Sequence, residues 1–293
     1  MDFQPTADQR ALQQGVRDLL ARRFDREALR AAVDAGGTLD RGLWRALGDA
    51  GFFALRLPEA EGGVGLGLPE AVLLFEEAGR ALLPGPLVDT HLAAGVVKGA
   101  ADGEVVVTAP YGSLVAHLAD ADVVRHPHEG ATPIRSVDPL TPLHRLPGPT
   151  PHPYPREGVL LTAAEQVGTA ARTLALAVQH ACERVQFGQP VGGFQAVKHL
   201  CAQMFVRVET ARTAVYAAAV TGTSVECAAA KLLADEAAVR NARDCLQVCG
   251  GMGFAWEADV HLHLKRAWVR AGRGPSKAET EEELAAALLG GTV

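Results

Sequence analysis

The 293-residue sequence predicts a mainly α-helical protein in three parts: an N-terminal helical domain (1–98), a reduced middle segment of strands and loops (99–158) and a C-terminal antiparallel four-helix bundle (159–293). Long apolar-faced helical patterns at both ends of the chain predict the helices. Short Gly- or Pro-containing connections between the later helices are typical of an antiparallel bundle. Nine of the seventeen prolines fall between residues 126 and 158, which disfavours helix and central strand there.

The first helix is predicted by a capping box at residues 6–9 and by the apolar face that follows it. This face consists of Leu12, Val16, Leu19, Leu20 and Phe24. A second helix should start after Asp40 and stop at Gly51. The residues that it should bury are Leu43, Trp44 and Leu47.

The rest of the N-terminal domain is a glycine-rich loop and a third helix. Residues 57–67 contain too much glycine for helix or strand. Pro69 fits the first turn of a helix that runs to Leu83, where Pro84 and Pro86 end it.

The middle segment shows only weak strand patterns. Residues 103–107 form a short β-like run, and residues 113–124 form a second weak apolar stretch. Residues 126–158 are expected to be loop. The pattern allows a few edge strands but no domain-sized sheet.

The C-terminal part is strongly helical. We expect long helices over residues 160–183, 194–220 and 225–249, a shorter one over 258–271, and a fifth around 279–283. Several alanines between residues 228 and 238 permit close contacts between helices.

Composition excludes several classes of function. The net charge of −6 and the pI near 5.9 give no electrostatic support for a nucleic-acid or anionic-membrane partner. No apolar run approaches the roughly 18 residues that span a bilayer, and the N-terminal residues do not match a signal peptide. We therefore expect a cytoplasmic protein. Its five scattered cysteines favour a reducing compartment and buried apolar roles.

Two segments carry chemistry. The first is Arg184-Val-Gln-Phe187-Gly-Gln-Pro, followed by Phe194-Gln195. It presents one cation, amides and aromatic rings. Arginine suits a pyrophosphate because its planar guanidinium donates two parallel hydrogen bonds. Taken alone, it also fits a packed corner between two helices with a solvated arginine.

The second segment is Gln247-Val-Cys-Gly250-Gly251-Met-Gly253. Glycines there would let backbone N–H groups approach a phosphate or a flat cofactor. No strand precedes it, so it is not a Rossmann loop. Taken alone, it fits a flexible turn between helices better than a binding loop.

Together, the two segments resemble the acyl-CoA dehydrogenase family, which carries an Arg-x-Gln-Phe-Gly…Phe-Gln element and a Gln-x-x-Gly-Gly-x-Gly element in its C-terminal four-helix bundle. Segments within residues 43–51, 57–66 and 75–82 are similar to that family as well. The resemblance covers roughly residues 1–98 and 159–271. The middle β-domain of the family, with its Thr-Glu-Pro…Gly-Ser-Asp element, has no clear counterpart.

The resemblance implies that the chain binds FAD at a subunit interface. By position, Arg184 bonds the FAD pyrophosphate of a neighbouring subunit, and Phe187 and Gln195 line the same cofactor. The loop that holds the adenosine–pyrophosphate part is matched by Gln247, Gly250, Gly251 and Gly253. In the family, the middle β-domain of another subunit completes each site.

The family reaction also needs a glutamate that removes the Cα proton of the acyl-CoA while a hydride leaves Cβ. The two positions where members keep it correspond to Gly274 and Gly158. Glu157 is a weak candidate because a one-residue shift would place it there. Glu165 is interpreted as a structural or solvated carboxylate, and Glu257 matches a structural position. We therefore expect no catalytic residue in this chain.

The resemblance then allows three interpretations. The first is a base-lacking subunit of a hetero-oligomeric, α2β2 acyl-CoA dehydrogenase of the actinobacterial type, with a related partner subunit supplying the glutamate. It would act on a bulky or steroid side-chain acyl-CoA and pass electrons to electron-transferring flavoprotein. The alternatives are a self-sufficient flavoenzyme on a CoA or carrier thioester with an unusual base, and a flavin-free scaffold.

The histidines give no metal or catalytic spacing. Surface positions are expected for His126, His128, His261 and His263. Cys245 and Cys249 lie one helical turn apart, but no further ligand completes a metal site.

Overall fold

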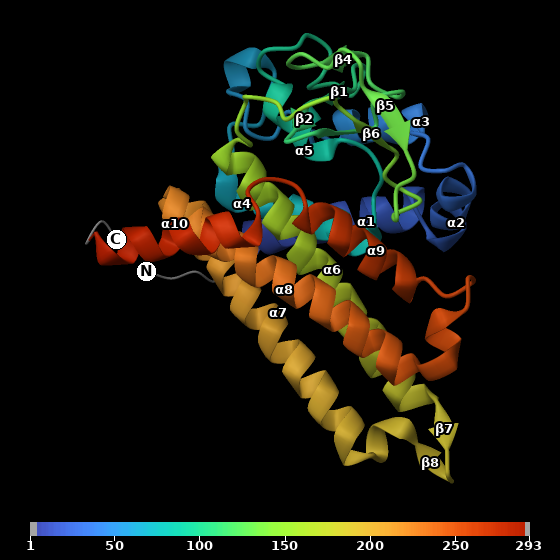
Figure 1. Cartoon of the computed structure of the whole chain (residues 1–293). Helices are drawn as coiled ribbons and strands as arrows, with labels where there is room; N and C mark the ends of the chain where they lie inside the picture. The colour runs from blue at the N-terminus through green and yellow to red at the C-terminus, as the bar shows by residue number, and fades with distance from the viewer. Residues whose placement is uncertain (1–4, 291–293) are drawn as a thin grey trace.

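The computed structural model describes residues 5–290, and its architecture is mainly helical, as the sequence predicts (Figure 1). Ten α-helices lie within this range, and a small lobe of strands and loops covers one end of the long helices. Helices α7 (Gln195–Thr221) and α8 (Ser224–Cys249) extend away from this lobe towards the hairpin of β7 (Val185–Gln186) and β8 (Gln189–Pro190). None of these helices is long and apolar enough to cross a membrane.

The first N-terminal helices form where capping and apolar patterns predict them. Helix α1 (Ala7–Arg23) begins after Thr6, whose hydroxyl accepts a hydrogen bond from the Gln9 backbone at 3.2 Å while the Gln9 side chain accepts one in return. Helix α3 (Arg41–Asp49) begins after Asp40, whose carboxylate caps it. Helix α3 buries the predicted residues Leu43, Trp44 and Leu47.

Two short helices are not predicted by the sequence pattern. Helix α2 (Arg26–Asp34) buries only Leu29 and Val33, a face too short to establish a period. Helix α5 (Leu87–Ala93) begins directly after Pro86, where the prolines indicated only the end of a helix. The glycine-rich segment before α4 forms a single 3₁₀ turn, η1 (Glu59–Glu61), and otherwise the expected loop.

Helix α4 (Leu68–Ala81) crosses α6 (Arg156–Glu183) so closely that their backbones touch. A Cβ atom on Gly79 would lie 2.0 Å from the carbonyl oxygen of Glu165 in α6. A Cβ atom on Gly168 would lie 1.9 Å from the carbonyl oxygen of Glu76 in α4. Only glycine fits at these two positions, since any side chain would overlap the facing backbone.

Two buried carboxylates fasten α4 to its other neighbours. Glu77 accepts a hydrogen bond from Arg17 of α1 at 2.6 Å. Glu76 accepts one from Arg212 at 2.9 Å and another from the hydroxyl of Tyr216 at 2.7 Å, both on α7. Because both carboxylates are buried and paired, α4 links the N-terminal helices to the C-terminal bundle.

The middle segment contains only short strands, as expected. A four-stranded sheet has the order β2 (Pro110–Tyr111), β3 (Leu114–Ala116), β6 (Leu143–Arg145) and β5 (Thr132–Ile134). A separate parallel pair joins β1 (Val107–Thr108) to β4 (Val123–Val124). The prolines of β2 and β5 lie on the two edge strands, where a missing N–H leaves no ladder bond unmade.

The helices of the C-terminal part are confirmed. Helices α6, α7 and α8 match the predicted long helices, and α9 (Val260–Ala271) and α10 (Lys277–Leu289) match the shorter ones. The connection between α6 and α7 differs from the expected simple turn: it contains the β7–β8 hairpin and a 3₁₀ turn, η2 (Val191–Gly193). The hairpin forms because Phe187 and Gly188 both adopt left-handed backbone, with φ of 53° and 81°.

The α4–α6 crossing makes a testable stability prediction. We expect Gly168→Ala to lower the free energy of unfolding by about 3 kcal/mol or more, because the new methyl must displace backbone. Gly15→Ala is the matched control, since Gly15 is an exposed helical glycine with open space around a built Cβ. The control should gain up to about 1 kcal/mol from helix propensity. Equal effects of both changes in urea unfolding would contradict the close contact.

Candidate functional site

The two segments singled out in the sequence lie at the same end of the bundle. The β7–β8 hairpin follows α6, and the 3₁₀ segment η3 (Gly250–Phe254) follows α8. A small buried cluster joins them: Val191 and Val197 pack on one side of it, and Val248 and Cys249 belong to the other. The structure therefore brings the arginine segment and the glycine loop together around one core.

The polar side chains of these segments point to solvent. Arg184, Gln195 and Gln247 are exposed, and none of the three side chains makes a hydrogen bond or ion pair within residues 5–290. A guanidinium and two amides that have no partner in their own chain can bind groups from outside it.

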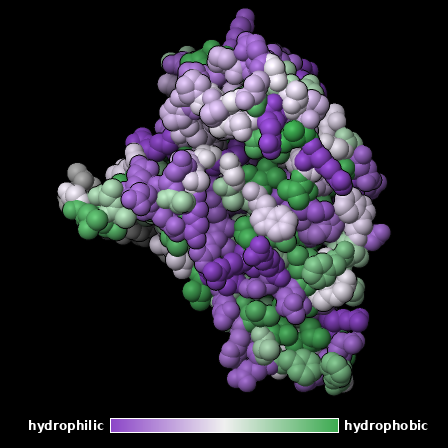
Figure 2. Space-filling model, in the orientation of Figure 1, coloured by the Kyte–Doolittle hydropathy of each residue, from purple (hydrophilic) through white to green (hydrophobic). Residues whose placement is uncertain are grey.

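Apolar side chains surround these polar groups. Phe187 is 91% exposed, and its ring contacts that of Phe194 edge to face at 6.0 Å between centroids. Met252 and Phe254 of η3 are exposed as well. Figure 2 shows apolar side chains gathered at the lower end of the molecule, where Figure 1 places the hairpin. Exposed aromatics on this scale are typical of a binding surface.

The three glycines of the loop serve different purposes. Gly250 has φ 60° and ψ −144°, a backbone conformation that other residues rarely adopt. A Cβ on Gly251 would meet nothing within 4 Å, which leaves its backbone open to a ligand or a partner. Gly253 is packed inside, since its Cβ would lie 3.0 Å from Cβ of Cys249.

At the other end of α6, one tyrosine fills the space beside both positions that correspond to the family glutamates. A Cβ on Gly158 would lie 2.9 Å from the ring of Tyr154, and a Cβ on Gly274 would lie 3.0 Å from the same ring. Gly274 also has φ 94°. A glutamate at either position would have to displace the tyrosine.

Tyr154 belongs to a tight polar–aromatic cluster. Its hydroxyl and that of Thr162 are 2.6 Å apart, and its ring meets Tyr111 edge to face at 4.1 Å. Arg273 lies over both rings, 5.2 Å from the centroid of Tyr111 and 5.6 Å from that of Tyr154. Asp89 accepts hydrogen bonds from Tyr111 at 2.5 Å and from Arg273 at 2.9 Å.

Burial sets the charges of this cluster. It raises the pKa of Tyr154 to about 12, so the phenol stays neutral and can donate a hydrogen bond. Burial opposes the charge of Arg273, but the two phenols and Asp89 hold the pKa of that guanidinium above its usual value. The cluster is thus a neutral aromatic pair around one buried Arg–Asp ion pair. Sequence reasoning missed this cluster, because its members lie far apart in the chain.

The carboxylates near this cluster are already paired. Arg56 donates to both oxygens of Glu157, at 2.7 and 3.0 Å, and these hydrogen bonds hold the pKa of Glu157 below its usual value. Glu165 forms a buried ion pair with Arg270 at 2.8 Å. Glu257 is exposed. A carboxylate held in a bidentate ion pair is a weaker proton acceptor than a free one.

One histidine lies elsewhere than expected. His126, His128 and His261 are partly exposed. His263 is only 3% exposed, because it lies on the side of α9 that packs against the rest of the protein, as its neighbours Leu262 and Leu264 do. The expectation of buried cysteines holds only for Cys227 and Cys245. The part of the chain that the structure describes contains no cluster of His, Cys, Asp and Glu able to hold a metal.

Comparison with known families gives two matches. Residues 6–102 match the N-terminal domain of acyl-CoA dehydrogenase, and residues 157–280 match its C-terminal domain. The chain is also similar to the acyl-CoA dehydrogenase IpdE2 of Mycobacterium tuberculosis. The two are 35% identical over 291 residues, which cover 90% of this chain and 92% of that protein.

Solved structures give the same fold. The steroid ACAD Tcur3481–Tcur3483 (G363A variant) has a TM-score of 0.84 at 23% identity and covers 97% of this chain and 98% of its own. The ChsE4–ChsE5 complex of Mycobacterium tuberculosis has a TM-score of 0.86 at 21% identity and covers 99% of both chains. From its two matched domains and its full-length similarity to IpdE2, this chain belongs to the acyl-CoA dehydrogenase family.

Proposed function

We propose that this chain is a subunit of an FAD-dependent acyl-CoA dehydrogenase complex and contributes half of a flavin site, while a related partner chain supplies the catalytic glutamate. The observation that carries the proposal is the position of Tyr154. Its ring occupies the space beside both Gly158 and Gly274, where the family keeps its base. No unpaired carboxylate replaces the base there among the described residues.

The flavin half of the proposal rests on the far end of the bundle. Arg184 would bond the pyrophosphate, and the exposed edge formed by Gln247, Gly250 and Gly251 would receive the adenosine part. Gln195 and the exposed ring of Phe187 would cover another face of the cofactor, and Gly253 would keep the loop packed on the bundle. Apart from the buried Gly253, these groups fit the cofactor because they are exposed, and the side chains of Arg184, Gln195 and Gln247 have no hydrogen-bond partner within residues 5–290. When bound, FAD supplies the acceptor for the hydride that leaves Cβ of the thioester.

Distance supports a site shared between subunits. Gly158 lies at the start of α6 and Arg184 directly follows its end, so about 26 residues of helix separate them by roughly 40 Å. This exceeds the length of an extended FAD molecule. Arg184 would therefore serve a flavin held against another subunit, and it would not reach the acyl end of its own chain.

Relatives suggest the kind of complex and substrate. One structure of the same fold is described as a steroid ACAD and another as a complex of two chains, ChsE4 and ChsE5. We therefore propose an α2β2 complex that dehydrogenates a bulky acyl-CoA, such as a steroid side-chain thioester, between Cα and Cβ. Electron-transferring flavoprotein would be its electron acceptor.

Replacing the arginine tests the flavin half-site. In the complex with its partner, we expect Arg184→Ala to weaken FAD binding roughly 10- to 100-fold, the size of a lost charge-assisted hydrogen bond. Arg240→Ala, which removes an exposed arginine from α8, is the matched control and should leave FAD bound. Unchanged FAD content after Arg184→Ala would favour a flavin-free scaffold.

Replacing Glu157 tests whether the chain holds its own base. We expect the kcat of the complex with Glu157→Gln to stay within about twofold of the unmodified complex, because this carboxylate is committed to Arg56. Arg56→Gln breaks the same ion pair and serves as the control for structural effects. A drop of about 100-fold or more in Glu157→Gln alone is the size expected for losing a general base, and it would show a self-sufficient enzyme.

A further inference from the structure

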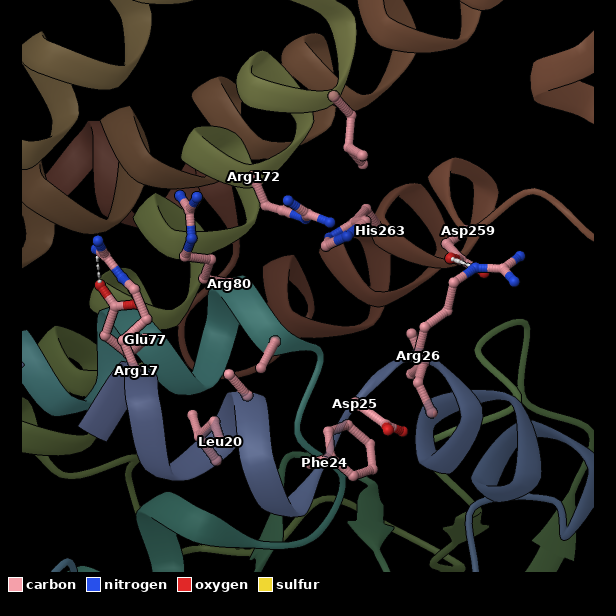
Figure 3. Close-up of a pocket in the computed structure, with 14 residues that line it drawn as sticks. Arg17, Leu20, Phe24, Asp25, Arg26, Glu77, Arg80, Arg172, Asp259 and His263 are labelled. Atoms are coloured by element: carbon pink, nitrogen blue, oxygen red, sulfur yellow. Dashed lines mark hydrogen bonds and ion pairs between the residues drawn. The ribbon is translucent and has the colours of Figure 1, made fainter. Parts of the chain in front are cut away.

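A cavity of about 340 Å³ lies between five helices, and neither Tyr154 nor a residue of the β7–β8 hairpin lines it. Its walls come from α1, α2, α4, α6 and α9 (Figure 3). The volume is at the lower end of the range for small-molecule sites. None of its residues belongs to the groups assigned above to the flavin or the acyl thioester.

The charges around this cavity are arranged unevenly. At one end, Arg17 is paired with Glu77 at 2.6 Å; at the other end, Arg26 is paired with Asp259 at 2.7 Å. Between these two ion pairs lie Arg80 of α4 and Arg172 of α6. Neither guanidinium makes a hydrogen bond or ion pair with any residue in the range 5–290.

A buried histidine faces the same unpaired arginines. His263 of α9 is 3% exposed and lines the cavity, and its Nδ1 has no hydrogen-bond partner among the described residues. Figure 3 shows Arg172 extending from α6 towards this ring. Burial, followed by the nearby cations Arg172, Arg270, Arg266 and Arg80, holds the pKa of His263 well below its usual value. The imidazole is therefore neutral near pH 7 and keeps one N–H for donation.

Glu77 and Asp25 also line the cavity, but among the described residues no carboxylate forms an ion pair with Arg80 or Arg172. Two partly buried guanidinium groups without an ion pair are unfavourable, because they repel each other and no hydrogen bond compensates for their lost hydration. Burial lowers the pKa of Arg80; Glu77 opposes this effect, and the nearby cations Arg17 and Arg172 add to it. An oxyanion between Arg80 and Arg172 would accept charge-assisted hydrogen bonds from both.

Apart from Asp25, the remaining wall of the cavity is apolar. Leu20 and Phe24 form the side opposite the arginines in Figure 3, and Leu29 and Leu176 also line the space. A free inorganic anion would leave this surface in contact with water. We propose that the cavity binds a small organic oxyanion, with its carboxylate or phosphate on Arg80, Arg172 and His263 and its apolar body against Leu20 and Phe24.

Calorimetric titration of the full-length chain with hexanoate, butyl phosphate, inorganic phosphate and hexanol tests this proposal at fixed ionic strength. We expect saturable binding of hexanoate, of butyl phosphate or of both, and the stronger of the two identifies the head group. Hexanol should not bind, because it lacks the charge. Binding of inorganic phosphate as tight as that of butyl phosphate would overturn the role of the apolar wall.

Two variants locate the site. Arg172→Gln should weaken binding of the organic anion at least about 10-fold, as expected for a lost charge-assisted hydrogen bond. Arg26→Gln removes the same charge from the same cavity and should bind nearly as the unmodified chain does, since Arg26 is committed to Asp259 and Arg30 also contacts that carboxylate. Equal losses in both variants, or no saturable binding of either organic anion to the unmodified chain, would overturn the proposal. The comparison of hexanoate with hexanol decides the question even if a variant fails to fold.

Discussion

Helices α4 and α6 touch through their backbones at Gly79 and Gly168, and the positions of the other elements depend on this crossing. It places α4 deep enough for Glu76 and Glu77 to be buried, where they bind α7 and α1. It also fixes α6, whose two ends carry the Tyr154 cluster and the β7–β8 hairpin. A side chain at either glycine would separate the helices by the width of a methyl group or more, and both ends of α6 would shift relative to the N-terminal helices.

The two ends of helix α6 differ in their surroundings. One end presents exposed, unpaired groups that suit a cofactor, and the other end is filled by the chain itself. Tyr154, Tyr111 and Arg273 occupy the space beside Gly158 and Gly274 with side chains that have few unmet hydrogen bonds. Such a cluster stabilises the fold, and the nearby carboxylates of Glu157 and Glu165 are both held by arginines.

The sequence predicts the helices well where the apolar face is long, as in α6, α7 and α8, and where capping is explicit, as at Thr6. It also predicts the two segments that the structure joins at one end of the bundle. It could not predict the burial of His263, which depends on the side of α9 that packs inward. Nor could it predict the Tyr154 cluster, whose members come from four distant parts of the chain and share no local pattern. The hairpin at Phe187 was missed because left-handed backbone at a phenylalanine has no sequence signal.

In the proposed function, this chain holds half of a flavin site and no base of its own. It is tested most directly by the amount of FAD and the acyl-CoA dehydrogenase activity of the purified chain, alone and after co-expression with a candidate partner subunit of the same family. We expect little FAD and no activity for the chain alone, and an active complex with fewer flavins than subunits. A homo-oligomer of this chain that carries one FAD per subunit and oxidises acyl-CoA would contradict the proposed function.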